Sequence, residues 1–314
     1  MKKQLNKRIT TIFLVIFVIC LLILTIGGIA MAIEHLSMIT TPVILLKGDK
    51  AVSQGTGFYY EQRVSSPVVI AILVTNYHVL TGYSPEKTNP PKGDNIIFYF
   101  HKDVKNPGDV KEIKLSLFTK NGKPIWLSSK EFPQADIAII PLAASLYDDV
   151  NVFAISEDWA KSDIKVRPTS TITLIGYPYG YYDKKNWLPV WKTGSIASES
   201  DVDFEGKPLF LVDISAFPGM SGSPAFAIAY GAYETIEGPT TAGHVQKFLG
   251  IYASMQVLKE EKYLEEIISE SKAGLVVSKS LELAHIWKAS LIMKIIKEID
   301  VKKYESEILK DLIP

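Results

Sequence analysis

The sequence predicts an all-β protein, either a sandwich or a pair of barrels, with an apolar N-terminal segment before it and a helical tail after it. From about Ile39 onward, short runs of β-branched and aromatic residues alternate with loops rich in Pro, Gly, Asn and Asp, a pattern typical of many short strands. The chain lacks the alternation of strands with helices that marks a doubly wound sheet. The candidate strands are, in order, TPVILL, TGFYY, VVIAILVT, NIIFYF, EIKLSL, DIAIIPL, TITLIG, PVWKTGSIAS, LFLVDIS, FLGIYAS and GLVVS.

The composition is that of a globular protein whose core is stabilised by packing. Of 314 residues, 47% are hydrophobic and 22% are charged, and the formal net charge is zero, so no general attraction to nucleic acid is implied. The one cysteine, Cys20, lies in the apolar N-terminal segment, so no disulfide can form within the chain.

The N-terminal segment has the length and flanks of a membrane anchor. Residues 9–33 contain no charged side chain, and residues 1–8 before them carry Lys2, Lys3, Lys7 and Arg8. A helix of this length, at about 1.5 Å per residue, exceeds the ~30 Å of a bilayer's hydrocarbon core. We therefore predict a transmembrane signal-anchor with its N-terminus in the cytoplasm, because basic flanks are retained on that side. The remainder would face the periplasm or the extracellular space.

A cleaved signal peptide is the alternative for the same segment. Ala30-Met31-Ala32 has the small-residue form of a cleavage site, and Gly27-Gly28 would end the helix before it. The apolar run, however, is longer than the 7–15 residues usual for a signal peptide, which favours a retained anchor. Cleavage after Ala32 would make the protein secreted, so both interpretations place its body outside the cytoplasm.

Further along the chain, two polar, Pro-containing loops are expected on the surface, at residues 84–95 and 101–110. Residues 143–170 are a plausible crossover between two halves of the body. In the tail, residues 281–314, apolar residues recur at helical spacing, which predicts a C-terminal helix. The residues with this spacing are Leu283, Ile286, Trp287, Leu291 and Ile295.

The stretch PGMSGSP, residues 218–224, raises the question of chemistry. A serine among glycines and prolines is most often part of a turn. It can also be a nucleophile beside bare backbone N–H groups, provided that a base and an orienting acid accompany it. His78, at the end of an apolar strand, is the candidate base, although a histidine there can simply bond a backbone carbonyl. Asp136, at the start of DIAIIPL, is the candidate acid, although it can also be the last polar residue of a loop.

The order of the three residues favours one architecture. His78 precedes Asp136 by 58 residues, and Asp136 precedes Ser221 by 85 residues. An α/β-hydrolase would have the reverse order and a glycine two residues after the serine, where this chain has Ser223. The order His, Asp, Ser, together with an all-β pattern, is that of chymotrypsin-like enzymes.

On these motifs the chain resembles trypsin-like serine peptidases, in the style of the disulfide-free bacterial HtrA-like and glutamyl-endopeptidase-like branches. The resemblance covers roughly residues 39–290. TNYHVL resembles the histidine motif, ADIAII the aspartate motif and GMSGSP the serine motif. Supporting matches are GTGFYY, IGYPYG, TGSIAS, LGIYAS and GLVVS.

The resemblance implies a chymotrypsin-like fold of two six-stranded antiparallel β-barrels, at about 39–150 and 165–280, with the active site between them. His78 would be the general base and then the general acid, and Asp136 would orient it. Ser221 would be the nucleophile, and the N–H groups of Gly219 and Ser221 would form the oxyanion hole. No cofactor is implied.

Two departures from the family pattern are apparent. Digestive relatives have an aspartate directly before the nucleophile, which pairs with a new N-terminus after zymogen cleavage. Met220 stands there in this chain and cannot form an ion pair, so activation by that route is not expected. Only 36 residues follow Ser278, too few for a PDZ domain, so none is expected.

The resemblance also implies a substrate-binding region. Ser215 would lie near the base of the first pocket, and Tyr252, Ala253 and Ser254 would line its wall. No acidic residue is evident at that base, so a strict preference for Lys or Arg is not expected. His244 is a candidate to meet an acidic substrate side chain.

The sequence leaves two other functions open. A catalytically silent or switched binding protein on the protease scaffold is one, since Met220 leaves room for a collapsed oxyanion loop. A membrane-anchored adaptor acting through its helical tail is the other, although the neutral tail favours packing onto the barrels. A metal site is unsupported, because HExxH and paired Cys or His spacings are lacking, and no basic stripe indicates nucleic-acid binding. The expected partners are a protein or peptide substrate and the membrane.

Overall fold

The computed structural model describes residues 33–63, 69–264, 273–300 and 304, and gives no side-chain detail for residues 255–281. The chain divides into two units, Met1–Glu34 and His35–Pro314, and the second holds all the elements discussed below. The predicted basic segment, residues 1–8, and all but the last residue of the predicted membrane segment, residues 9–33, lie outside the described residues. Among the described residues, none of the helices has both the length and the apolar character needed to cross a bilayer.

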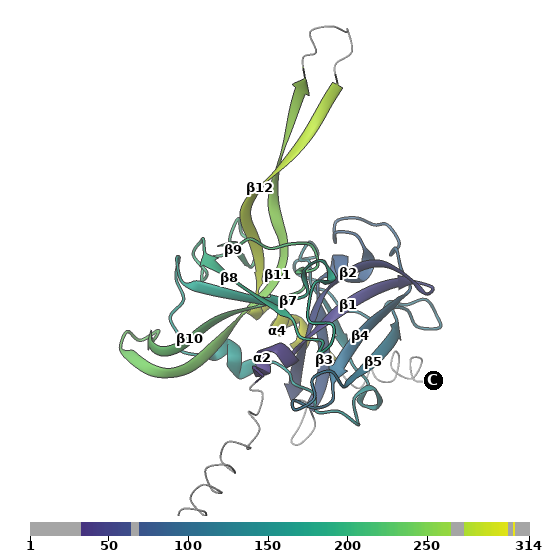
Figure 1. The fold of residues 1–314 in the computed structure, drawn as a ribbon, viewed down its shortest axis with the longest axis horizontal. Coiled ribbons are helices and arrows are strands. Elements are labelled where there is room, and N and C mark those ends of the chain that lie inside the picture. The colour runs from purple at the N-terminus through teal and green to yellow at the C-terminus, as the bar shows by residue number, and fades with distance from the viewer. Residues whose placement is uncertain (1–32, 64–68, 265–272, 301–303, 305–314) are drawn as a thin grey trace, which may run out of the picture. The chain divides into compact units, whose positions relative to one another are not determined.

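The first half of this unit is a six-stranded antiparallel sheet, as predicted, with the strand order β5-β4-β1-β2-β3-β6 (Figure 1). It is not the closed barrel that was predicted, because its edge strands β5 and β6 do not pair with each other. Residues 117–127 span the gap instead: Ile125 N–H donates to Leu117 O (3.0 Å) and Leu127 N–H to Ile139 O (2.8 Å). The strands are β1 Thr40–Lys47, β2 Lys50–Arg63, β3 Val69–Thr75, β4 Asn95–His101, β5 Val110–Ser116 and β6 Ala138–Pro141.

The second half is a closed six-stranded barrel with the order β10-β11-β12-β9-β8-β7, which confirms the predicted barrel there. Strands β11 and β12 continue their pairing well beyond the barrel, as far as Leu264 opposite Ala273 (Figure 1). The strands are β7 Thr171–Gly176, β8 Val190–Ile196, β9 Leu209–Asp213, β10 Pro224–Glu234, β11 Thr240–Leu264 and β12 Ala273–Lys288.

The central strands of the first sheet are apolar on both faces because each face meets a different core. In β3, Ile70, Ile72 and Val74 belong to one buried cluster, and Ala71 and Leu73 belong to another. Successive side chains of a strand point to opposite faces, so a strand between two cores has an uninterrupted apolar sequence. The position of β3 between two cores therefore explains its apolar sequence, VIAILVT.

The first of these cores is shared by both halves of the unit. It contains Phe58 and Ile72 of the first sheet, Phe226 and Phe248 of the barrel, and Ile292 of the C-terminal helix. The rings of Phe58 and Phe248 meet edge to face with centroids 5.5 Å apart, a favoured aromatic geometry. The two halves are therefore joined by apolar packing as well as by the connecting chain.

The helices are short, and one differs from its prediction. The C-terminal helix α4 covers Ala289–Lys297 and does not begin at Leu281, because β12 continues to Lys288. Ala284 and Ile286 are buried while His285 between them is partly exposed, and these residues pair with β9. Residues 283–287 therefore form a strand, and their apparent helical spacing is accidental. The other helices are α2 His35–Met38, α3 Tyr77–Thr81, η1 Ala144–Leu146, η2 Glu157–Lys161 and η3 Pro178–Gly180.

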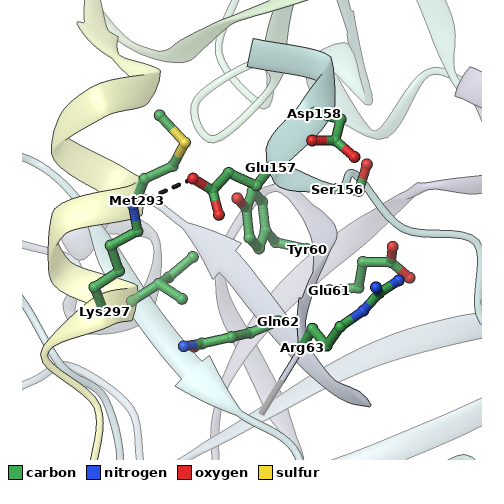
Figure 2. Close-up of a pocket in the computed structure, with 10 residues that line it drawn as sticks. Tyr60, Glu61, Gln62, Arg63, Ser156, Glu157, Asp158, Met293 and Lys297 are labelled. Carbon is green, nitrogen blue, oxygen red and sulfur yellow. Dashed lines mark hydrogen bonds and ion pairs between the residues drawn. The ribbon is translucent and has the colours of Figure 1, made fainter. Parts of the chain in front are cut away.

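Helix α4 packs beside a cavity of about 380 Å³ between β2 and η2 (Figure 2). Lys297 of α4 forms an ion pair with Glu157 of η2, with Nζ and Oε1 3.2 Å apart. Tyr60 of β2 lines the same cavity, and burial raises the pKa of its hydroxyl well above the ordinary value. The helix thus connects the end of the barrel to the first sheet and to the crossover.

Candidate active site

His78 and Asp136 are brought together by the two strands that precede and follow them. His78 lies in α3, directly after β3, and Asp136 lies just before β6, which pairs with β3. The side chain of Asn76, at the N-cap of α3, donates to the backbone carbonyl of Asp136 (2.6 Å). The pairing of β3 with β6 therefore sets the distance between the two residues.

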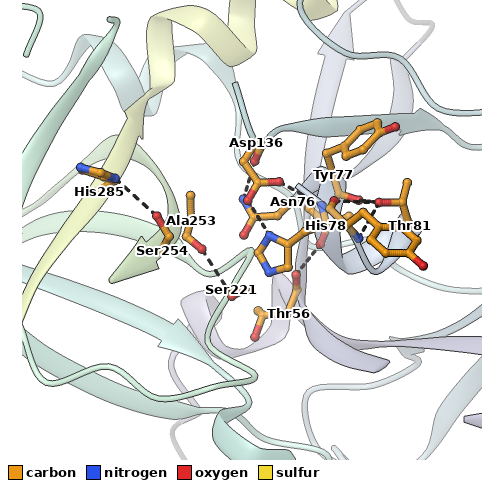
Figure 3. Close-up of polar contacts among 12 residues, drawn as sticks. Thr56, Asn76, Tyr77, His78, Thr81, Asp136, Ser221, Ala253, Ser254 and His285 are labelled. Atoms are coloured by element: carbon orange, nitrogen blue, oxygen red, sulfur yellow. Dashed lines mark hydrogen bonds and ion pairs between the residues drawn. The ribbon is translucent and has the colours of Figure 1, made fainter. Parts of the chain in front are cut away.

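Asp136 directs both of its carboxylate oxygens to His78 (Figure 3). Oδ1 accepts a hydrogen bond from the backbone N–H of His78 (2.9 Å), and Oδ2 lies 2.5 Å from Nδ1 of the imidazole. The Asp136 side chain is 14% exposed and that of His78 is 31% exposed. The carboxylate is thus shielded from water, and the edge of the ring that carries Nε2 is directed away from it.

Ser221 lies on a tight loop before β10, whose backbone is shaped by two glycines. Gly219 has φ 96° and Gly222 has φ 90°, a region that other residues rarely adopt. A Cβ at Gly222 would lie 1.9 Å from the carbonyl oxygen of Thr56, so this position has no room for a side chain. Met220, between them, is fully buried in the barrel core, consistent with its apolar character.

The serine loop and the histidine helix meet at Gly55 of β2. A Cβ at Gly55 would lie 2.4 Å from the side chain of Val79, next to His78, and 3.0 Å from the carbonyl oxygen of Ser221. In Figure 3, Ser221 and Asp136 lie on different sides of the His78 ring. The structure therefore brings the three residues singled out in the sequence into one place.

The hydroxyl of Ser221 is bonded elsewhere in this arrangement. Its Oγ donates to the carbonyl of Ala253, with a long separation of 3.4 Å. Among the described residues, no hydrogen bond joins Ser221 to His78. Such a long bond is weak, so the hydroxyl is poorly held by it.

The backbone N–H groups on either side of Met220 differ from their neighbours in their hydrogen bonding. Within the part of the chain that the structure describes, the N–H groups of Gly219 and Ser221 donate to no other protein group. The carbonyls of the same two residues, by contrast, are both bonded to Thr56. Two neighbouring donors without acceptors beside a serine can bind an oxyanion.

A hollow of about 480 Å³ adjoins His78 and Asp136. Ala253 and Ser254, which were predicted to contact substrate, both line it, and Ser254 lies 3.4 Å from Nδ1 of His285. The other predicted substrate residues lie elsewhere: Ser215 is exposed in the loop after β9, and Tyr252 is 4% exposed in the barrel core.

Most residues that line this hollow were not predicted as site residues, and Lys207, His285 and Trp287 are among them. Burial lowers the pKa of His285, and the charge of Lys207 lowers it further. Recognising 281–288 as a strand would have placed His285 beside Ser254. His244 lies instead on the β10–β11 hairpin, with its ring stacked on Tyr230.

The described residues contain no group of three or more His, Cys, Asp or Glu side chains arranged to bind a metal ion. The groups gathered at this site include the Ser221 hydroxyl, the His78 imidazole, the Asp136 carboxylate and the backbone amides of the serine loop.

Comparison with known families decides the identity. Residues 55–232 match the trypsin-like peptidase domain. The chain belongs to the trypsin-like peptidase family. This trypsin-like peptidase is a hydrolase, specifically a serine endopeptidase. The comparison with curated proteins found no matching sequence.

Solved structures resemble the peptidase only distantly. The Rv3671c protease in its inactive form is 15% identical, with a TM-score of 0.40 over 84% of this chain and 90% of that chain. A serine endoprotease from Yersinia pestis is 14% identical, with a TM-score of 0.41 over 86% and 64%. The inactivated scabies mite protease paralogue S-I1 is 16% identical, with a TM-score of 0.40 over 85% and 99%.

Proposed function

We propose that this peptidase is a membrane-anchored, extracytoplasmic endopeptidase that cleaves protein or peptide substrates through His78, Asp136 and Ser221. The observation that carries the proposal is the double contact of Asp136 with the backbone N–H and Nδ1 of His78. With Nδ1–H donating to the carboxylate, the lone pair of Nε2 is available as a base.

In the proposed reaction, Oγ of Ser221 attacks the scissile carbonyl carbon while its proton passes to Nε2 of His78. The C–N bond then breaks, and Nε2 gives the proton to the departing amine, which leaves an ester on Ser221. A water molecule attacks this ester in the same way, and the carboxylic acid product leaves. Asp136 stabilises the imidazolium in both halves of the reaction without taking up the proton.

The N–H groups of Gly219 and Ser221 are proposed to bind the oxyanion that forms in each attack. Each such donor is worth about 3 kcal/mol of transition-state stabilisation in enzymes of this kind. Ala253 and Ser254 are proposed to contact substrate in the hollow beside His78. Ser215, which lies outside that hollow in the exposed loop after β9, is also proposed to contact substrate.

The anchor rests on sequence alone. Residues 9–33 are proposed to cross the membrane with residues 1–8 in the cytoplasm, so that the peptidase faces outward. Cleavage after Ala32 would release it as a secreted enzyme.

One observation favours the alternative, a silent or switched binding protein on the same scaffold. The hydroxyl of Ser221 bonds to Ala253 and must rotate toward Nε2 before it can react. Rotation of a serine hydroxyl is fast, and catalytic hydrogen bonds are often long or misaligned before substrate binds, so this geometry is also compatible with an active enzyme.

Labelling of the full-length protein with a fluorophosphonate distinguishes the two functions. We expect the parent to be labelled, and Ser221→Ala and His78→Ala to lose labelling. Matched controls are Ser145→Ala, at an exposed serine of η1, and His244→Ala, at an exposed histidine of β11. Both controls should label like the parent. A well-folded parent that resists labelling would contradict the catalytic proposal and support the binding protein.

A further inference from the structure

Thr56 lies between the two glycines of the GTGFYY stretch in β2 and is completely buried. Although it belongs to the first sheet, it forms two hydrogen bonds with the serine loop of the second half. Its N–H donates to the carbonyl of Ser221 (2.8 Å), and its Oγ1 donates to the carbonyl of Gly219 (2.8 Å). The hydroxyl reaches across 163 positions of sequence to do so.

The remaining hydrogen bonds of Thr56 hold it in one orientation. Oγ1 also accepts from the N–H of Tyr177, at the end of β7 (3.0 Å). The carbonyl of Thr56 accepts from Oγ1 of Thr75 in β3 (2.7 Å). Every polar group of this residue therefore has a partner, and the hydroxyl proton is directed at Gly219 because the Tyr177 amide occupies the acceptor side.

These bonds hold the peptide units on either side of the Ser221 amide. The peptide joining Gly219 to Met220 is held at its carbonyl by Thr56 and at its N–H by Phe217 O (3.0 Å). The peptide joining Ser221 to Gly222 is held at its carbonyl by Thr56 and at its N–H by Tyr252 O (2.9 Å). The peptide that carries the Ser221 N–H lies between these two, and its own carbonyl, that of Met220, accepts from the N–H of Ser223 (2.9 Å). This bond and the two neighbouring peptides together limit the direction of the Ser221 N–H.

We propose that Thr56 is a positioning residue that sets the direction of the oxyanion-binding amides of Gly219 and Ser221. This inference rests on the proposed function, since the amides matter only if an oxyanion forms. Thr56 acts through the serine loop and touches no reacting atom. The side chain of Met220 contributes apolar packing to the loop, whereas the side chain of Thr56 contributes a hydrogen bond.

The test replaces the Thr56 hydroxyl in the full-length protein without changing the shape of the side chain. Thr56→Val removes Oγ1, and Thr56→Ser retains it. Thr41→Val is the matched control, because Thr41 is a buried threonine of the same sheet. Its Oγ1 accepts from Tyr99 N–H (2.8 Å) and, in the part of the chain that the structure describes, forms no hydrogen bond with the serine loop.

For Thr56→Val we expect kcat on a peptide ester, and the rate of fluorophosphonate labelling, to fall at least about tenfold, or about 1.4 kcal/mol in the barrier. KM should change by less than about twofold, since ground-state binding is not affected. Thr56→Ser should recover most of kcat. Thr41→Val should lose stability comparable to Thr56→Val and retain kcat.

Amide hydrogen exchange of the loop peptide covering residues 214–223 provides a readout independent of activity. We expect faster exchange there in Thr56→Val and no change in Thr41→Val. Unchanged exchange in Thr56→Val would overturn the positioning role whether or not the parent is active. A kcat retained within about twofold in an active parent would overturn it too. If the parent is inactive but exchange responds, the proposed catalytic function fails while the ordering of the loop by Thr56 stands.

Discussion

Gly222 shows how much of the site depends on one missing side chain. Its φ of 90° and the carbonyl of Thr56, 1.9 Å from where a Cβ would be, combine a backbone penalty with a steric one. The loop can approach β2 closely enough for Thr56 to bond it only because this position has no Cβ.

We predict that Gly222→Ala disrupts the serine loop. A non-glycine residue at positive φ costs roughly 1–3 kcal/mol, and the clash with backbone atoms adds to that cost. Gly231→Ala is the control, because Gly231 has φ 99° but nothing within 4 Å of its Cβ position. Thermal unfolding and labelling measured on both variants separate the two effects. Equal losses in the two variants would show that the close approach to Thr56 does not matter.

At the residue scale, the sequence predicted the contact of Asp136 with His78 but not the hydrogen bonds of the serine loop. His78, Asp136 and Ser221 were identified from their order and from the motifs around them, and Asp136 contacts His78 as expected. GTGFYY was noted only as a supporting match. A hydrogen bond that spans 163 positions leaves no periodic signal, so the contacts of Thr56 were not predictable. The bond from Ser221 to Ala253 depends on a single side-chain rotation and was equally hidden.

The segment 101–110 was expected on the surface because it is polar and contains proline, and Lys102, Asp103, Lys105, Asn106 and Asp109 are indeed exposed. The exceptions are His101, the last residue of β4, and Pro107, which are buried. His101 at its start is only 5% exposed, and its Nδ1 lies 2.8 Å from the carbonyl of Pro107. Burial lowers the pKa of His101, while the carbonyls of Pro107 and Trp187 offset part of that effect. The loop therefore packs against the segment around Trp187 of the second half.

We predict that acid weakens this packing. The pKa of His101 is lower in the folded protein than in the unfolded chain, so both states hold a neutral ring above the ordinary pKa of about 6.5. As the pH falls below that value, the unfolded state takes up a proton first, and the free energy of unfolding decreases. Urea unfolding between about pH 7.5 and pH 5, compared with His101→Gln, measures the contribution. A pH slope identical in the two proteins would remove His101 as its source.

At the level of elements, strand β12 is the part of the fold that the residue pattern predicted incorrectly. The side chains of Leu283, Ile286 and Trp287 fit a helical spacing, and they fit a strand as well when the strand is buried on both faces. Pairing with β9 and β11 decides between these, and pairing partners 30 or more positions away are not visible in a window of sequence. The later part, Leu291 and Ile295, had only the helical spacing and does form α4.

At the scale of the whole unit, the shared core makes the two halves dependent on each other. Phe248 of β11 is 1% exposed and contacts the ring of Phe58 in the first sheet and that of Phe226 in β10. Six strands in each half followed from the family resemblance, but the shared core did not. The sequence did not predict that the first sheet is open. Its edge strands β5 and β6 are linked only through a segment with isolated bridges, which lie outside the strands.

We predict that Phe248→Ala destabilises both halves together. Removing a buried phenylalanine costs about 3–5 kcal/mol, and the cavity would open in a core that the halves share. Far-ultraviolet circular dichroism and tryptophan fluorescence should report one coincident unfolding transition in the parent and in the variant. Tyr230→Ala, at an exposed aromatic of the β10–β11 hairpin, is the control and should change stability little. Two separated transitions in the variant would contradict the shared core.

The crossover between the halves gives the shared core a practical consequence. Asp148 and Asp149 lie in an exposed turn, with side chains 69% and 58% exposed, between the part of the chain that carries His78 and Asp136 and the part that carries Ser221. A chain divided there would give two fragments, each with an apolar surface that only the other can cover. Neither fragment would hold all three residues of the proposed reaction. Mixed together, they would recover the site only by assembling, so this protein is suited to fragment complementation, with hydrolysis as the signal that two tethered partners have met.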